Sequence, residues 1–177
     1  NGEYWGLYNI MERKNDEFVK NHTGGLPDHM ITASTSNRPK VEKGDGFSYE
    51  VIVDRLNNNP DEEEIIRILE ENFNINALLD FWCHEIILGR VDLYNNRLWK
   101  DLDTENKWGF ISYDYDMCFI APESNNIIKR YLNSPKATGI NHIGAFMQSK
   151  QFRNIYVYRM LEYLNFGYSE NKILEIL

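Results

Sequence analysis

The stretch NRLWKDLDTENKWGFISYDYDMCF, residues 96–119, reads as two short strands joined by a polar turn. Apolar and aromatic residues in NRLWK and KWGFIS are typical of strands. The segment DTEN, residues 103–106, lies between them and suits a hairpin loop. The sequence therefore predicts a β-hairpin whose second strand runs directly into two aspartates, Asp114 and Asp116.

These two aspartates are unusual because the residues around them are mostly apolar or aromatic. We expect the segment to be buried, and a buried carboxylate is normally paired, hydrogen-bonded or bound to a metal ion. Residues i and i+2 of a strand face the same side, so the two like charges would repel unless a cation lay between them. Asp114 and Asp116 are therefore candidate metal ligands.

Two other interpretations of the pair stay open. One is a structural pair at a strand end, with one acid capping a turn and the other solvated. The other is the Asp-x-Asp element of nucleotide-sugar glycosyltransferases, which also holds a divalent ion. That element usually follows a doubly wound α/β half, and the helical pattern upstream of the hairpin does not supply one.

The rest of the chain predicts an α+β domain. Helical periodicity alternates with short apolar runs and with turn residues such as Gly, Pro and Asn. The helix at 74–89 is apolar on most faces and should run through the core. We expect strands at 4–11 and 28–34, a surface loop at 34–46, and helices at 15–25, 47–60, 61–73, 74–89 and 150–164.

The first strand has a further implication for assembly. Asn-Gly at residues 1–2 is a hairpin turn signal, so the partner of the strand at 4–11 would lie upstream of Asn1. An unpaired strand edge would let two copies of the chain pair as a dimer.

Composition narrows the classes of partner. The chain has 27 acidic and 19 basic residues and a net charge of -8, which would repel a phosphate backbone, so we expect no nucleic-acid partner. No apolar run approaches the ~20 residues of a membrane span.

Cys83 and Cys118 stand in apolar surroundings without zinc-type spacing, which indicates two buried thiols or one disulfide.

The order of polar residues around the hairpin matches kinase-type phosphoryl transfer. In that chemistry a loop aspartate takes the hydroxyl proton, an asparagine shortly after it holds Mg²⁺, and an aspartate after a short hairpin bridges the metal to the phosphates. Here Asp92 precedes Asn96 by four positions and Asp114 by 22. Mg²⁺ prefers oxygen ligands, which all three residues carry. Taken alone, Asp92 is also an ordinary turn residue.

At these residues the sequence resembles the CotH kinase-like family, atypical kinases named for a spore coat protein. Residues 1–18 are similar to the family's Asn-Gly turn, aromatic strand and Glu-Arg pair. LLDFWCHEIILGRVDLYNNRLWKD, residues 78–101, and KWGFISYDYDMCF, residues 107–119, look like its catalytic loop and metal-binding hairpin. SKQFRNIYVYRMLEYLN, residues 149–165, is like its C-terminal helix. The resemblance covers nearly the whole chain.

The resemblance implies a divergent two-lobed protein-kinase-like fold, complete or truncated in its N-terminal lobe. Residues 1–47 would be the remnant of the β-rich N-terminal lobe and residues 48–177 a mostly helical C-terminal lobe, with the site in the cleft between them. It also implies ATP with Mg²⁺ or Mn²⁺ as cofactors and phosphorylation of Ser or Thr in secreted, cell-surface or spore coat proteins.

The same resemblance implies roles for individual residues. Asp92 would be the catalytic aspartate, Asn96 and Asp114 metal ligands, and Asp116 a second ligand or a structural acid. Glu12 would be either the ion-pair acid of the nucleotide lobe or simply a helix-entry residue beside Arg13.

The sequence departs from the family pattern at two places. The loop GRVDLYNN, residues 89–96, is short and lacks a leading Asn, and the strand where relatives often carry a lysine has Thr32 and Ala33. These departures favour the alternative function, a non-catalytic pseudokinase or an interaction module of a coat or extracellular assembly.

Overall fold

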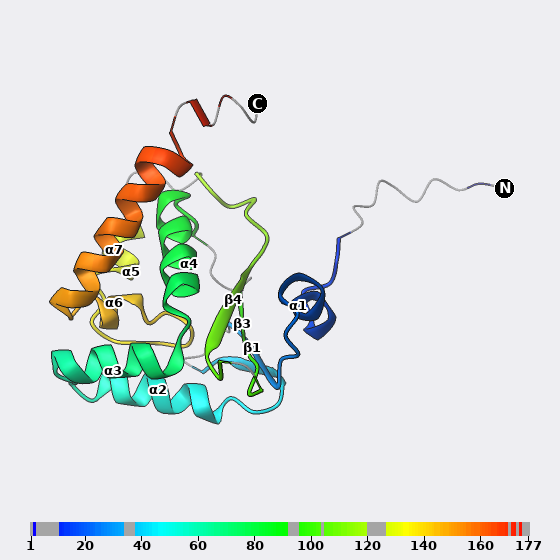
Figure 1. The fold of residues 1–177 in the computed structure, drawn as a ribbon, viewed down its shortest axis with the longest axis horizontal. Helices are drawn as coiled ribbons and strands as arrows, with labels where there is room; N and C mark the ends of the chain where they lie inside the picture. Colours follow the sequence, from blue (N-terminus) through cyan, green and yellow to red (C-terminus); the bar gives the residue numbers. More distant parts are fainter. Residues whose placement is uncertain are drawn as a thin grey trace.

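The computed structural model describes residues 2, 11–33, 38–91, 96–103, 105–119, 127–169, 171, 172 and 174. Over these residues the protein is α+β, with a four-stranded antiparallel sheet that has helices on both faces (Figure 1). The helices are α1 (Asp16–Thr23), α2 (Phe47–Asn57), α3 (Glu62–Asn72), α4 (Ile75–Ile87), α5 (Ile127–Tyr131), α6 (Ile143–Phe146) and α7 (Lys150–Glu162), and a π-helical turn, η1 (Tyr163–Gly167), continues α7. The strands are β1 (His29–Thr32), β2 (Lys40–Lys43), β3 (Asn96–Lys100) and β4 (Trp108–Ser112).

The strand order in the sheet is β2-β1-β3-β4. β3 and β4 form the predicted hairpin, in which Asn96 lies opposite Ser112 and Lys100 opposite Trp108. The chain therefore enters β3 and leaves β4 at the same end, which we call the open end of the hairpin.

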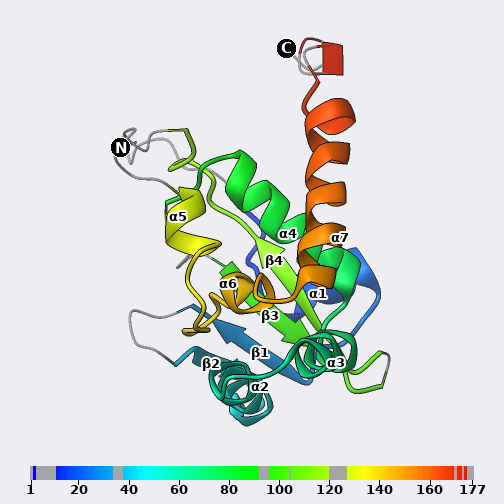
Figure 2. The same ribbon diagram turned by 90° about the vertical axis from the view of Figure 1, so that its left-hand side faces the viewer.

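The sheet separates a small apolar cluster from a large one. Val19 of α1 packs with Met30 and Ile111 on one face. The opposite face, formed by residues that alternate with these along the strands, packs against the helices of the main core. In Figure 2, α4, α5, α6 and α7 lie in front of the sheet and α1 lies behind it.

The main core is rich in aromatic side chains. Trp82 from α4, Phe146 from α6 and Phe152 from α7 are fully buried and pack together with Trp108 of β4. Burying a large apolar side chain contributes about 1.5–3 kcal/mol. The prediction that the helix at 74–89 runs through the core is confirmed.

Helix ends follow the signals in the sequence. The Asn15 side chain accepts a hydrogen bond from the Phe18 amide at 3.2 Å and caps α1, which ends at Gly24 with φ 77°. α4 is capped by Asn74 and is followed by Gly89, whose φ of 63° a residue with a Cβ rarely adopts.

One predicted loop contains a strand. Within residues 34–46 the structure finds β2, paired antiparallel with β1. All four β2 side chains are exposed, so the strand is held by backbone pairing and leaves no apolar alternation in the sequence. Residues 34–37 lie outside the described part.

Two other predictions concern residues or divisions that the structure describes only in part. Residues 3–10 lie outside the described part, so the strand at 4–11 and the dimer that depends on it stay predictions. β1 and β2 pair in one sheet with β3 and β4, and Ile31 of β1 belongs to the main core. The division into two kinase lobes at residue 47 stays a prediction.

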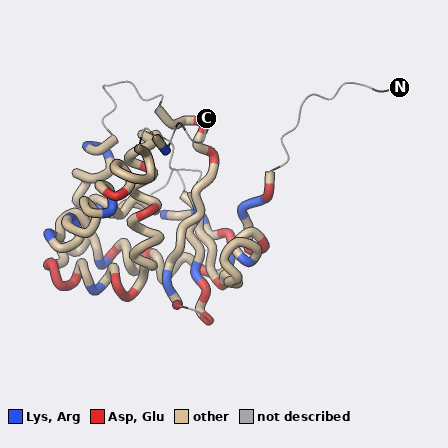
Figure 3. The backbone as a smooth tube through the Cα atoms, turned by 45° about the horizontal axis from the view of Figure 1, so that its top comes forward, with Lys and Arg blue, Asp and Glu red and all other residues tan. Residues whose placement is uncertain are grey.

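The structure also shows how the charged residues and the two cysteines are distributed. Figure 3 shows basic residues interspersed with acidic ones along the described helices. Cys83 is buried, Cys118 is partly buried, and both are free thiols. In the described part of the chain, no helix combines the length and the apolar character that crossing a membrane requires.

Candidate functional site

Asp114 and Asp116 follow the open end of the hairpin and are exposed. The prediction that this segment is buried is wrong, because β4 ends at Ser112 and the chain then leaves the sheet. Asp114 has a left-handed backbone, φ 65°. Such a backbone is uncommon for residues other than glycine, although aspartate tolerates it better than most.

Residues 113–119, which we call the acidic segment, fold back onto the end of α4. The Phe119 amide donates a hydrogen bond to the Leu88 carbonyl at 3.0 Å, and the Cys118 amide donates to the Tyr115 carbonyl at 3.2 Å. Phe119 also has a left-handed backbone, φ 59°, which is rare for a bulky side chain. The segment thus has a defined path around its two exposed acids.

A fully buried arginine, Arg90, lies between α4 and the open end. Its Nη1 donates to Glu85 Oε1 at 3.0 Å and to Asn96 Oδ1 at 2.7 Å. Its Nη2 donates to the Tyr113 carbonyl at 2.8 Å. Arg90, Glu85 and Asn96 each have 0% exposure. One guanidinium therefore joins α4, the start of β3 and the start of the acidic segment.

Tyr115 completes this arrangement from the acidic segment. Its hydroxyl donates to Glu85 Oε1 at 3.0 Å, and Arg90 Cζ lies 4.6 Å from its ring centre. Burial raises the pKa of Tyr115 to about 12, which keeps the phenol protonated. Burial also raises the pKa of Glu85, against the opposing effect of Arg90 and Tyr115. We call Glu85, Arg90, Asn96 and Tyr115 the polar cluster.

The surroundings of Asn96 do not suit a metal ligand. Its Oδ1, the atom that a metal would use, already accepts a hydrogen bond from the Arg90 guanidinium and is out of reach of solvent. A second cation at this oxygen would be repelled by Arg90. The exposed carboxylates of Asp114 and Asp116 do suit a hard divalent cation.

The remaining predicted site residues lie elsewhere. Asp92 falls outside the described residues. Glu12 is exposed and is bonded to α1, since its Oε2 lies 2.8 Å from His22 Nε2, and this hydrogen bond lowers the pKa of Glu12. α1 covers the sheet face opposite to the one that Asn96 faces. Within the described ranges, no group of three or more His, Cys, Asp or Glu residues could hold a metal ion.

The centre of the polar cluster, Glu85 and Arg90, was not predicted from the sequence. Glu85 lies inside the apolar run of α4, and Arg90 lies directly after it. Gly89 separates the two residues, so their spacing is not one that predicts a contact along a helix. A charge in an otherwise buried helix requires a partner. This rule could have predicted from the sequence that Glu85 and Arg90 form a pair.

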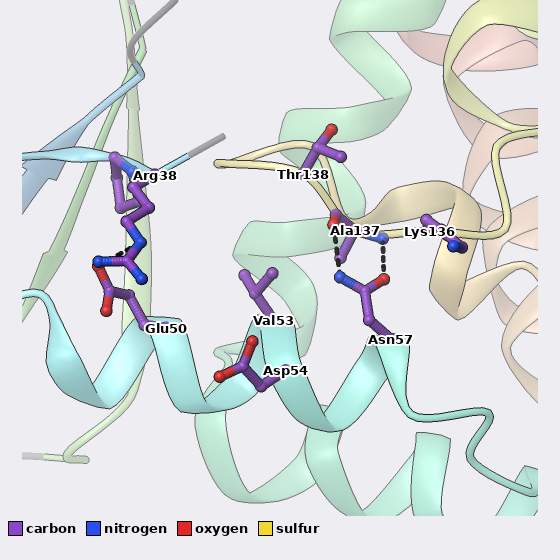
Figure 4. Close-up of a pocket in the computed structure, with 9 residues that line it drawn as sticks. Arg38, Glu50, Val53, Asp54, Asn57, Lys136, Ala137 and Thr138 are labelled. Carbon is purple, nitrogen blue, oxygen red and sulfur yellow. Dashed lines mark hydrogen bonds and ion pairs between the residues drawn. The ribbon is translucent and has the colours of Figure 1, made fainter. Parts of the chain in front are cut away.

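A separate cleft of about 340 Å³ lies between α2 and residues 136–138 (Figure 4). The Asn57 amide closes one side, because it exchanges two hydrogen bonds with the backbone of Ala137, at 2.8 and 2.9 Å. Arg38 lies 3.9 Å from Glu50 across the other side. The lining combines basic and acidic side chains, and the acidic ones would repel a phosphate group. This cleft is therefore a weaker candidate for a phosphate site than the acidic segment would be with a cation bound to it.

Comparison with models of protein families supports the family resemblance of the sequence. The family model described as CotH kinase protein matches residues 1–176. A search of curated proteins and a search of solved structures each gave no match.

Proposed function

This chain belongs to the CotH kinase protein family, and we propose that it is an atypical protein kinase. In this proposal it transfers the γ-phosphoryl group of ATP to serine or threonine of a protein substrate and has a two-lobed kinase-like fold. Family membership makes the protein kinase-like, and the activity and substrate are the proposal.

The observation that carries the proposal is the register of the hairpin. Asn96 and Ser112 lie opposite each other at the open end. Asp92 precedes Asn96 by four positions, and Asp114 follows Ser112 by two. In the proposed mechanism, Asp92 and Asp114 would meet at these adjacent strand ends, in the order that kinase-type transfer uses.

Asp114 and Asp116 would hold the divalent cation, Mg²⁺ or Mn²⁺. When bound, the ion would neutralise charge on the phosphate oxygens of ATP. Asn96 as a further ligand stays a prediction, and it requires the Oδ1 of Asn96 to leave Arg90. The nucleotide role of Glu12 likewise stays a prediction.

Asp92 would act on the acceptor. It accepts the hydroxyl proton while the serine or threonine oxygen forms a bond to the γ-phosphorus. The bond between that phosphorus and the β–γ bridging oxygen breaks, and ADP leaves. Positioning and charge neutralisation supply most of the rate enhancement in such a reaction.

Transfer of label from ATP carrying a radioactive γ-phosphate tests the activity, with casein and the chain itself as acceptors and Mn²⁺ as the metal. We expect labelled serine or threonine, and a loss of at least about 100-fold in Asp92→Asn. Asp103→Asn, at the exposed hairpin turn, is the matched control and should keep full activity. Equal transfer by the wild type and Asp92→Asn would remove Asp92 from the proposed mechanism.

The second candidate is a non-catalytic pseudokinase or interaction module of a coat or extracellular assembly. One observation favours it. Thr32, close to the strand position where the resemblance implies a lysine, is buried, and its hydroxyl donates to the Asn96 carbonyl at 2.9 Å. ATP binding by the wild type without any transfer of label would favour this alternative.

A further inference from the structure

Arg90 contacts three segments that the proposed reaction must hold together. Its two terminal nitrogens bond to Glu85 in α4, to Asn96 at the first position of β3, and to the Tyr113 carbonyl, directly before Asp114. Arg90 itself stands two positions before Asp92 in the sequence. Its bonds therefore connect the residues that flank 92–95 with the start of the acidic segment.

The bonds to Glu85 and Asn96 are made out of contact with water, and the bond to the Tyr113 carbonyl is partly buried. Charge-assisted hydrogen bonds are stronger than neutral ones, and a low local dielectric strengthens them further. The Tyr115 ring covers the guanidinium, and its hydroxyl bonds to the same Glu85 oxygen as Arg90 does. The acidic segment is thus attached to the cluster by a backbone carbonyl and by a side chain.

The stability of an ion pair does not by itself account for this arrangement. A buried pair can often be replaced by apolar residues of similar volume without loss of stability. An apolar replacement would fill the space between α4 and the hairpin equally well. It would not donate to Asn96 Oδ1 or to the Tyr113 carbonyl, which are the bonds that fix the two ends of the site.

We propose that Arg90 is the positioning residue of the site, and that it fixes the start of β3 and the acidic segment relative to each other. This inference rests on the proposed function, because the site that Arg90 would position is the one proposed for phosphoryl transfer. Arg90 acts through Asn96 and Tyr113 and does not touch the substrate. A lysine could keep the charge opposite Glu85, but a single ammonium lacks the two-armed fork that reaches both segments.

The experiment compares two double variants that replace an ion pair with the same apolar residues. Glu85→Leu with Arg90→Met removes the pair in the cluster. Arg55→Met with Glu64→Leu removes a partly exposed pair, 2.8 Å apart, between α2 and α3. We expect the unfolding midpoint of the Arg55 variant to stay within about 4 °C of the wild type. The midpoint of the cluster variant should fall further, because Asn96 Oδ1 and the Tyr113 carbonyl lose their donor. Arg90→Lys is the second variant, for the case in which the first does not fold.

Hydrogen exchange is measured without nucleotide or metal, at the amides of Cys118 and Phe119, whose acceptors are the Tyr115 and Leu88 carbonyls. We expect exchange at these two amides to be about tenfold faster in the cluster variant and in Arg90→Lys, and unchanged in the Arg55 control. The inference would be overturned if exchange were unchanged in both the cluster variant and Arg90→Lys. It would also be overturned if exchange increased equally in the Arg55 control.

Kinetics supply the readout that a purely structural role would not change. If the wild type transfers phosphate, the cluster variant should lose about 100-fold in kcat, and its KM for ATP should rise as well, because the acidic segment that Arg90 fixes would hold the metal and the nucleotide. A cluster variant with wild-type kcat would also overturn the inference. An inactive wild type would contradict the proposed function alone, because hydrogen exchange still decides the role of Arg90.

Discussion

Two of the buried polar centres in the described part of the chain differ in their charge. His142, 1% exposed, lies among the rings of the main core, with Nδ1 2.9 Å from the Tyr49 hydroxyl. The Trp82 indole donates to its Nε2 at 3.4 Å, and the Phe73 ring centre lies 5.0 Å away. Burial lowers the pKa of His142 to about 3, so this centre is neutral at pH 7. The polar cluster, by contrast, is built around the Arg90–Glu85 ion pair.

The difference shows where the fold keeps buried charge. His142 satisfies its ring nitrogens within the aromatic core and needs no counter-charge. Arg90 keeps its charge next to the open end of the hairpin, where it bonds to the segments on either side of the candidate site. The charged centre therefore joins two chain segments through hydrogen bonds, whereas the neutral one lies within the packed aromatic core.

The largest effect is expected when the charged centre loses one partner. Arg90→Met alone leaves Glu85 buried without its cation and should cost about 3–5 kcal/mol of unfolding free energy. Arg55→Met breaks two partly exposed ion pairs, to Glu64 and Glu71, and should cost about 2 kcal/mol or less. Urea unfolding of both variants measures the difference, and equal losses would contradict the contrast between buried and exposed pairs.

The neutral centre should respond to acid. His142 has a folded pKa of about 3 against an ordinary value of 6.5, so the unfolded chain binds the extra proton. Its contribution to stability is complete above pH 6.5 and is lost as the pH falls towards 3, at up to about 1.4 kcal/mol per pH unit. Unfolding between pH 6.5 and 5 checks this. A His142→Gln variant should lose that slope, and the same slope in both proteins would contradict the assignment.

The hydroxyl beside His142 provides a smaller test of the same centre. Tyr49→Phe keeps the ring but leaves His142 Nδ1 without the hydroxyl partner, and it should cost about 1–2 kcal/mol. Tyr158→Phe, at an exposed ring of α7, is the control and should change stability by less than about 0.5 kcal/mol. Equal changes in the two variants would mean that the Tyr49 hydroxyl contributes nothing to the core.

The smallest effect concerns the backbone of the acidic segment. Asp114→Gly relieves the backbone strain of a residue with φ 65° but also removes its side chain, so the unfolding midpoint should change by no more than about 3 °C. We expect this small change to accompany the loss of metal-dependent nucleotide binding. Calorimetry measures the midpoint, and a clear fall would mean that the Asp114 side chain stabilises the segment by more than its backbone strain costs.

The sequence predicted the elements whose signals are local. The hairpin and the apolar character of α4 both follow from neighbouring residues. β2 was missed because its exposed side chains carry no apolar alternation, and its pairing with β1 is a tertiary contact.

The candidate site was less predictable than the fold. Asp114 was expected to be buried because its neighbours are aromatic, but the end of a strand cannot be located to within two residues from composition. The polar cluster joins residues from 85 to 115 through contacts that no local pattern specifies. Only the rule that buried charges are paired could have indicated Arg90, and it would not have identified Asn96 or Tyr113 as partners.

Thermal unfolding with and without ATP plus Mn²⁺ tests the central claim, a metal-dependent nucleotide site at the acidic segment. At a hundred times its dissociation constant, a ligand stabilises the folded state by about 2.7 kcal/mol. We predict a rise in the midpoint that requires both ATP and Mn²⁺, is absent in Asp114→Ala, and persists in Asp103→Ala. An absent shift in the wild type, or an undiminished shift in Asp114→Ala, would contradict the claim.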